Sequence, residues 1–201
     1  GLMDTEVDTF NRKLYASFKY SAEKIIQNFC QSKNLKFYIM RIFNTYGDHK
    51  DQFSFVEKLI KVKRKNLYLN LINNGISLRD FIHLSDVGAI YKKFLINEYD
   101  SGVYDIGTGK GVLIKNLVEF SNIDKKKIIN KNNISQINRS IADTKKLQKN
   151  LDGFKFKSLD SYLRDRLKIK NKNKLNFTKY NYQITKYEGS VIYGAGFAGK
   201  E

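Results

Sequence analysis

The segment "LYASFKYSAEKIIQNF", residues 14–29, has the apolar spacing of a helix and places a tyrosine and a lysine one turn apart. Its apolar residues, Phe18, Ala22, Ile25, Ile26 and Phe29, recur at intervals of three and four. We expect a helix over residues 15–32, preceded by an irregular polar stretch, 1–13. Because positions i and i+4 share a helix face, Tyr15 and Lys19 are expected to project to the same side.

The rest of the chain alternates between strand and helix patterns. Strands are predicted at 36–43, 66–72 and 102–109, and helices at 53–64, 110–122, 143–151 and 158–168. Segment 77–96 reads as a short strand entering a helix with Ser85 as its N-cap, and 122–138 as a surface excursion. This alternation predicts an α/β fold.

The composition of the chain restricts its functional classes. The net charge is +17, but only seven of the 37 basic residues are Arg, Lys and Asn are abundant throughout, and Pro is absent. This pattern favours a general compositional drift over a nucleic-acid site, although a positive field attracts phosphorylated small molecules. Cys30 is the single cysteine, and no apolar run approaches the ~20 residues that span a membrane. We therefore expect a cytoplasmic protein without membrane contact.

The Tyr15/Lys19 pair admits a chemical interpretation and a structural one. A free tyrosine has a pKa of about 10, and stabilising a phenolate enough to act near pH 7 requires about 4 kcal/mol. A neighbouring ammonium and a cationic cofactor ring can supply this, so that the phenol exchanges protons with a sugar or alcohol hydroxyl. Alternatively, the pair is only part of a solvated helix face.

Five segments together resemble the extended short-chain dehydrogenase/reductases, the NAD-dependent nucleotide-sugar epimerases and dehydratases. They are "YASFKYSAEKI" (15–25), "RIFNTYG" (41–47), "SLRDFIHLSDVGAI" (77–90), "GVYDIGTGKGVLIKNLVE" (102–119) and "RSIADTKKL" (139–147) followed by "FKFKSLDSYLRD" (154–165). They occur in the order typical of the family. The resemblance implies a partial Rossmann-like NAD-binding domain with its C-terminal substrate-binding lobe.

The resemblance also implies roles for individual residues. Tyr15 would be the acid/base on the substrate hydroxyl, and Lys19 would bind the nicotinamide ribose and stabilise the phenolate. Phe43 would pass beside the nicotinamide, Asn44 would contact the diphosphate of a nucleotide sugar, and Arg79 would clamp a phosphate. Each of the last three has a structural alternative: Phe43 as core, Asn44 as a loop cap, and Arg79 paired with Asp80 or Asp86.

Some features depart from the family pattern. Ala16, Ser17 and Phe18 stand between the Tyr and the Lys where Gly and Ser are usual, and Asp48 replaces the usual Pro after Tyr-Gly. The family's Arg ahead of the closing segment falls near Asn133, so Arg139 would substitute only with a shorter loop. The family's N-terminal Gly-rich turn does not precede Tyr15, so we expect a C-terminal fragment that is inactive alone.

The last residues contain a second Gly-rich motif. In "VIYGAGFAGKE", 191–201, Gly194, Gly196 and Gly199 follow a predicted strand and precede a predicted helix. We expect domains at 1–168 and 190–201, the latter the start of a second Rossmann-like unit, joined by a linker at 169–189. These glycines form a possible second nucleotide site.

The sequence therefore predicts a NAD-dependent nucleotide-sugar epimerase or dehydratase, here as a fragment, that acts as a homodimer. The sequence leaves open which sugar and which nucleotide are used, and whether the protein is an epimerase, a dehydratase or a reductase. The alternative is a non-catalytic relative of the same fold that binds RNA or serves as a scaffold, supported by the +17 charge. His49 and His83 lack nearby Cys or paired carboxylates in the sequence, so no metal site is expected.

Overall fold

The computed structural model describes residues 2–47, 51, 53–132, 139–170 and 174–179, with side chains from Leu14 onward. Helices alternate with short strands, many of them in parallel pairs, which confirms the α/β prediction. The helices are α1 (Leu2–Ser32), α2 (Phe55–Lys65), α3 (Leu84–Ile96), α4 (Ile114–Phe120), α5 (Lys145–Asn150) and α6 (Leu159–Leu167), with 3-10 turns η1 (Asn73–Gly75) and η2 (Lys125–Lys127). The strands are β1 (Tyr38–Ile42), β2 (Asn44–Tyr46), β3 (Leu69–Ile72), β4 (Leu78–His83), β5 (Gly102–Ile106), β6 (Lys110–Leu113), β7 (Ile128–Lys131), β8 (Arg139–Ser140) and β9 (Thr178–Lys179).

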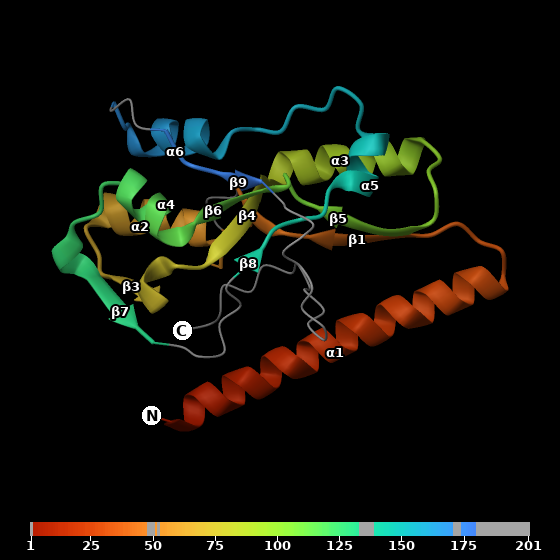
Figure 1. Ribbon diagram of the computed structural model, residues 1–201, viewed down its shortest axis with the longest axis horizontal. Helices are drawn as coiled ribbons and strands as arrows, with labels where there is room; N and C mark the ends of the chain where they lie inside the picture. The colour runs from red at the N-terminus through yellow and green to blue at the C-terminus, as the bar shows by residue number, and fades with distance from the viewer. Residues whose placement is uncertain (1, 48–50, 52, 133–138, 171–173, 180–201) are drawn as a thin grey trace.

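Helix α1 is longer than predicted, because it begins at Leu2 and not near Tyr15. The prediction of an irregular stretch at 1–13 is therefore wrong: after Gly1 the stretch contains neither Gly nor Pro, and nothing in it stops a helix from extending backwards. The helix ends where Asn34 adopts a left-handed conformation (φ 51°) and the amide of Leu35 bonds the carbonyl of Cys30. In Figure 1, α1 lies along the lower edge, away from the sheets over most of its length.

The predicted strand 36–43 continues further, as β1 and β2 joined at Phe43. β1 pairs in parallel with β5, and β2 pairs in parallel with β4. β4 also pairs with β8 in parallel and with β6 in antiparallel orientation. The segment at Phe43 thus passes from one sheet to the next, and the residues on either side of it face different strands.

Two local predictions need correction. His83, and not Ser85, is the N-cap of α3, because its Nδ1 accepts a hydrogen bond from the Ser85 amide at 3.1 Å. Residues 110–122 form strand β6 before helix α4, and not one helix, because Lys110–Leu113 pair with β4. The predicted excursion at 122–138 includes η2 and β7, and β7 pairs in parallel with β3.

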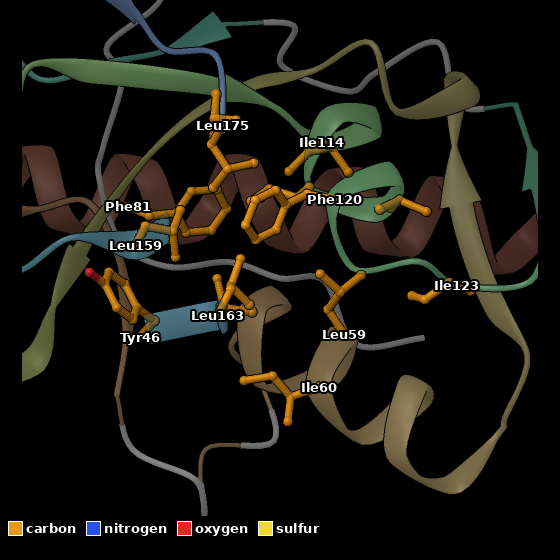
Figure 2. Close-up of a cluster of buried hydrophobic side chains, with 14 of the residues drawn as sticks. Tyr46, Leu59, Ile60, Phe81, Ile114, Phe120, Ile123, Leu159, Leu163 and Leu175 are labelled. Carbon is orange, nitrogen blue, oxygen red and sulfur yellow. The ribbon is translucent and has the colours of Figure 1, made fainter. Parts of the chain in front are cut away.

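One hydrophobic cluster joins α2, α4 and α6 to β4. Figure 2 shows side chains from all three helices converging on Phe81 and Phe120. Leu163 of α6 is fully buried and Leu59 of α2 likewise. Burying a Leu or Phe side chain contributes about 1.5–3 kcal/mol, so this cluster holds α2 and α6 firmly in place.

Part of the predicted linker packs against the domain. Leu175 is buried in the same cluster, its amide bonds Asp160 at 2.9 Å, and β9 pairs with β6. The domain boundaries stay a prediction. Residues 180–201, which include Gly194, Gly196 and Gly199, lie outside the described residues, as do Asp48, His49 and Asn133.

Candidate active site

The predicted Tyr–Lys pair shares one face of α1. The Lys19 Nζ lies 5.6 Å from the centroid of the Tyr15 ring. The Tyr15 side chain is half-buried and Lys19 is exposed. The two side chains therefore lie on the same side of the helix, as their i, i+4 spacing predicted, and their catalytic roles stay a prediction.

The same side of α1 is tied to the sheet by an ion pair that the sequence analysis missed. Glu23, one turn beyond Lys19, is 8% exposed. Its two carboxylate oxygens accept bonds from Arg41 of β1, from Nε at 3.0 Å and from Nη2 at 2.7 Å. Arg41 stands opposite Asp105 of β5. Burial raises the pKa of Asp105, and the Arg41 charge is one of the influences that oppose this shift. Glu23 follows Tyr15 by eight residues, a spacing that places both on the same helix face. This spacing was the signal in the sequence that could have identified Glu23.

Phe43 and Asn44 occupy the crossing between the two sheets. The Phe43 ring is 2% exposed and the side chain of Asn44 is half-buried. The Asn44 Nδ2 donates to the carbonyl of Asp80 at 2.9 Å, while its neighbour across the strand pair is Phe81. The structure thus links Asn44 directly to the β4 segment that carries Arg79.

Asp80 organises the turn after β5. The sequence analysis considered it only as a pairing partner of Arg79 and did not predict this role. It is fully buried, and its carboxylate accepts bonds from the Thr108 amide and hydroxyl and from the Gly109 amide at 2.8 Å. The Ala142 amide donates a further bond at 3.3 Å. Burial raises the pKa of Asp80, and these donors oppose that shift. A Cβ on Gly107 would come within 2.8 Å of the carboxylate, which explains the glycine there.

Arg79 is half-buried in β4. Its Nη1 donates to the Leu78 carbonyl at 3.0 Å, and burial lowers the pKa of Arg79 to about 10. The sequence analysis offered Asp80 and Asp86 as pairing partners of Arg79. The Asp80 carboxylate accepts hydrogen bonds from the β5–β6 turn and from Ala142, and Asp86 accepts one from the Lys157 amide at 2.8 Å. As predicted, Asp86 lies in the first turn of α3. A bound anion would favour the charged guanidinium that burial disfavours.

Glu57 holds the backbone of the turn that follows β2. Its Oε1 accepts from the Tyr162 hydroxyl at 2.5 Å and from the Gly47 amide at 3.3 Å. Arg166 lies 3.7 Å from the other oxygen. Gly47 has φ +107°, and a Cβ there would approach the His83 ring to 2.5 Å.

The structure therefore assembles the predicted residues in two groups. Asn44 bonds the backbone of Asp80, the residue that follows Arg79 in β4, whereas Tyr15 and Lys19 stand on α1, which Glu23 ties to β1. Within the described ranges, no three His, Cys, Asp or Glu side chains gather closely enough to hold a metal ion. No helix in the same ranges has both the length and the apolar content to cross a bilayer.

The family model described as "NAD dependent epimerase/dehydratase family" matches residues 3–107. The chain belongs to this family. The predicted family is thereby confirmed, and with it NAD as the family's cofactor.

Individual relatives agree with this assignment. The dTDP-D-glucose 4,6-dehydratase of Homo sapiens is 28% identical over 112 residues, covering 54% of this chain and 32% of the human protein. The ADP-L-glycero-D-manno-heptose-6-epimerase of Fusobacterium nucleatum is 35% identical over 82 residues, covering 35% of this chain and 25% of that protein. The chain thus spans about a third or less of the length of these curated relatives.

Solved structures share the fold. UDP-glucose 4-epimerase from Thermotoga maritima with UDP-glucose superposes with a TM-score of 0.62 at 25% identity, covering 75% of this chain and 50% of that one. The dTDP-glucose 4,6-dehydratase from Bacillus anthracis in complex with NAD gives a TM-score of 0.66 at 19% identity, covering 77% and 50%. The predicted partial Rossmann-like fold is confirmed.

Proposed function

We propose that this chain is the C-terminal part of a NAD-dependent nucleotide-sugar epimerase or dehydratase. The observation that carries the proposal is the Tyr15/Lys19 pair, with the ammonium 5.6 Å from the phenol ring on one face of α1. Membership of the epimerase/dehydratase family supports it. The upstream half of the full protein would complete the cofactor site, and the 201-residue chain alone is expected to be inactive.

In this proposal Tyr15 accepts the proton of a sugar hydroxyl and later returns it. Lys19 donates to the ribose hydroxyls of NAD and stabilises the phenolate, for which its exposed ammonium is suited. The chemistry that bound NAD would supply is reversible acceptance of a hydride from the sugar carbon. The nicotinamide would lie beside Phe43. Glu23 and Arg41 keep α1 in a fixed orientation on β1.

The nucleotide sugar would bind at the second group of residues. Arg79 is half-buried and cationic, and a guanidinium can clamp a diphosphate through two parallel hydrogen bonds. Asn44, held by the Asp80 carbonyl, would contact the same diphosphate. The solved relatives with UDP-glucose bound support this substrate class.

A homodimer is proposed through α1. Leu14, Phe18, Ile25 and Phe29 form an exposed apolar stripe, and Phe18 and Ile25 are each 67% exposed. The centre of this stripe lies about a quarter turn around the helix from the centre of the Tyr15/Lys19 pair, so the two occupy neighbouring faces of α1. We place the whole protein in the cytoplasm.

The full-length protein tests the proposal with a panel of UDP- and dTDP-linked hexoses, with products followed by NMR. We expect turnover of at least one sugar. Lys19→Met should lower both the turnover number and the affinity for NAD, because it removes the ammonium but keeps the stem. Lys24→Met on the exposed side of α1 is the matched control and should change neither. Absence of NAD binding, together with an RNA affinity that falls steeply with salt, would favour the RNA-binding alternative.

A further inference from the structure

A pocket of about 450 Å³ opens between the C-terminal ends of α2 and α6. Both helices lie away from α1 in Figure 1. In the part of the chain that the structure describes, its lining is Lys63, Arg64, Arg166, Leu167 and Lys168. Four of these five side chains are cationic. The volume is in the range of sites for small molecules.

Two of the four cations of this pocket, Arg64 and Lys63, are held in place by backbone carbonyls. The Arg64 Nη2 donates to the carbonyl of Arg166 at 2.6 Å, which joins the two helix ends. The Lys63 Nζ bonds the carbonyl of Asn122. Positive residues at helix C-termini are common because they complement the helix dipole. A carbonyl, however, carries no net charge, so these contacts orient the cations without neutralising them.

The choice of residue also favours an anion with several oxygens. Lys outnumbers Arg 30 to 7 in this chain, yet two of the seven arginines, Arg64 and Arg166, line this pocket. A guanidinium offers five donors in a planar fork that matches phosphate oxygens, whereas an ammonium is a point charge. Arg166 is further positioned by the Tyr162 hydroxyl, 3.3 Å from its Nη1.

We propose that this pocket binds a small phosphate-bearing anion, and that Arg166 connects it to the turn after β2. Glu57 is 6% exposed and lies 3.7 Å from Arg166, while its other oxygen holds the Gly47 amide. An anion in the pocket competes with Glu57 for Arg166. Binding is therefore transmitted to Gly47, which follows the strand that carries Asn44.

Pyrophosphate titration of the 201-residue chain by calorimetry and by amide NMR tests the proposal. We expect saturable binding with shifts at Leu167 and Lys168, and a smaller shift at Gly47. Perturbation at Leu167 and Lys168 identifies this pocket and distinguishes it from binding at Arg79. Arg64→Gln combined with Lys168→Gln should weaken binding roughly ten- to a hundredfold, because two charge-assisted contacts are lost.

The matched control is Lys92→Gln combined with Lys149→Gln, which removes the same charge from exposed positions on α3 and α5. It should leave the affinity within about twofold, as expected for screened surface charges. If the Arg64 variant does not fold, Lys63→Gln with Lys168→Gln replaces it with the same expectation. Equal weakening by the test and control pairs, non-saturable binding, or binding of an RNA oligonucleotide but not of pyrophosphate would overturn the proposal.

Discussion

The attachment of α1 to the sheet depends on the Glu23–Arg41 ion pair, and Glu23→Gln is the perturbation that tests it. Removing one partner of a buried ion pair costs about 3–5 kcal/mol, because the other charge stays buried. Here the Arg41 side chain is 25% exposed and that of Glu23 is 11% exposed. Asp105 also stands opposite Arg41 and partly compensates its charge. We therefore expect a loss of about 2–3 kcal/mol in the free energy that holds α1 against β1.

Native-state hydrogen exchange of the α1 amides around Glu23 measures this free energy directly. The expected loss corresponds to exchange that is roughly 30- to 150-fold faster. Glu98→Gln is the matched control, because Glu98 pairs with Lys36 but is exposed, and it should leave exchange unchanged. Less than a threefold increase for Glu23→Gln would refute the claim that this pair positions the helix bearing Tyr15 and Lys19.

Three further predictions concern the residues around the candidate substrate site. Asp80→Ala should lower the free energy of unfolding by about 3–5 kcal/mol in urea titrations, because the backbone and hydroxyl groups that donate to Asp80 lose a buried acceptor. A loss below about 1 kcal/mol would contradict the role of Asp80 as organiser of the turn. Because burial raises the pKa of Asp105, the folded state binds a proton more tightly than the unfolded state. The contribution of Asp105 to stability should therefore fall as pH rises from about 4 through the raised pKa. Asp105→Asn should remove that slope from unfolding free energies measured from about pH 4 upward, and an unchanged slope would refute the assignment. Gly47→Ala should lower the free energy of unfolding by about 1–3 kcal/mol, since φ is +107° and the new Cβ would meet His83. Thermal unfolding measures this loss, and an unaltered melting temperature would contradict the described turn.

The sequence predicted those parts of the fold that local patterns determine. The helix of Tyr15 and Lys19, the strand that ends before Phe43 and the helix α6 each have a clear local pattern, and the structure contains all three. The resemblance over residues 15–165 supplied the fold class, since the order of the motifs is specific where each motif alone is not. The residues of the candidate site followed from those motifs.

What the sequence did not predict depends on contacts between distant segments. Strand β6 exists because it pairs with β4, although Lys110–Leu113 continues smoothly into the helical pattern of α4. The bonds from Asp80 to the β5–β6 turn and from Glu23 to Arg41 join residues 18 or more positions apart. No periodicity marks such pairs. The N-cap of α3 was misplaced because a histidine side chain serves where Ser is usual.

The turnover of Tyr15→Phe in the full-length protein tests the central claim most directly. The substitution removes only the hydroxyl, and Tyr20→Phe, one turn along α1 on an exposed side chain, is the matched control. We predict that Tyr15→Phe lowers the turnover number by a factor of about 10²–10⁴ while NAD stays bound, and that Tyr20→Phe leaves it unchanged. Turnover by Tyr15→Phe at the rate of the unmodified protein would contradict the account.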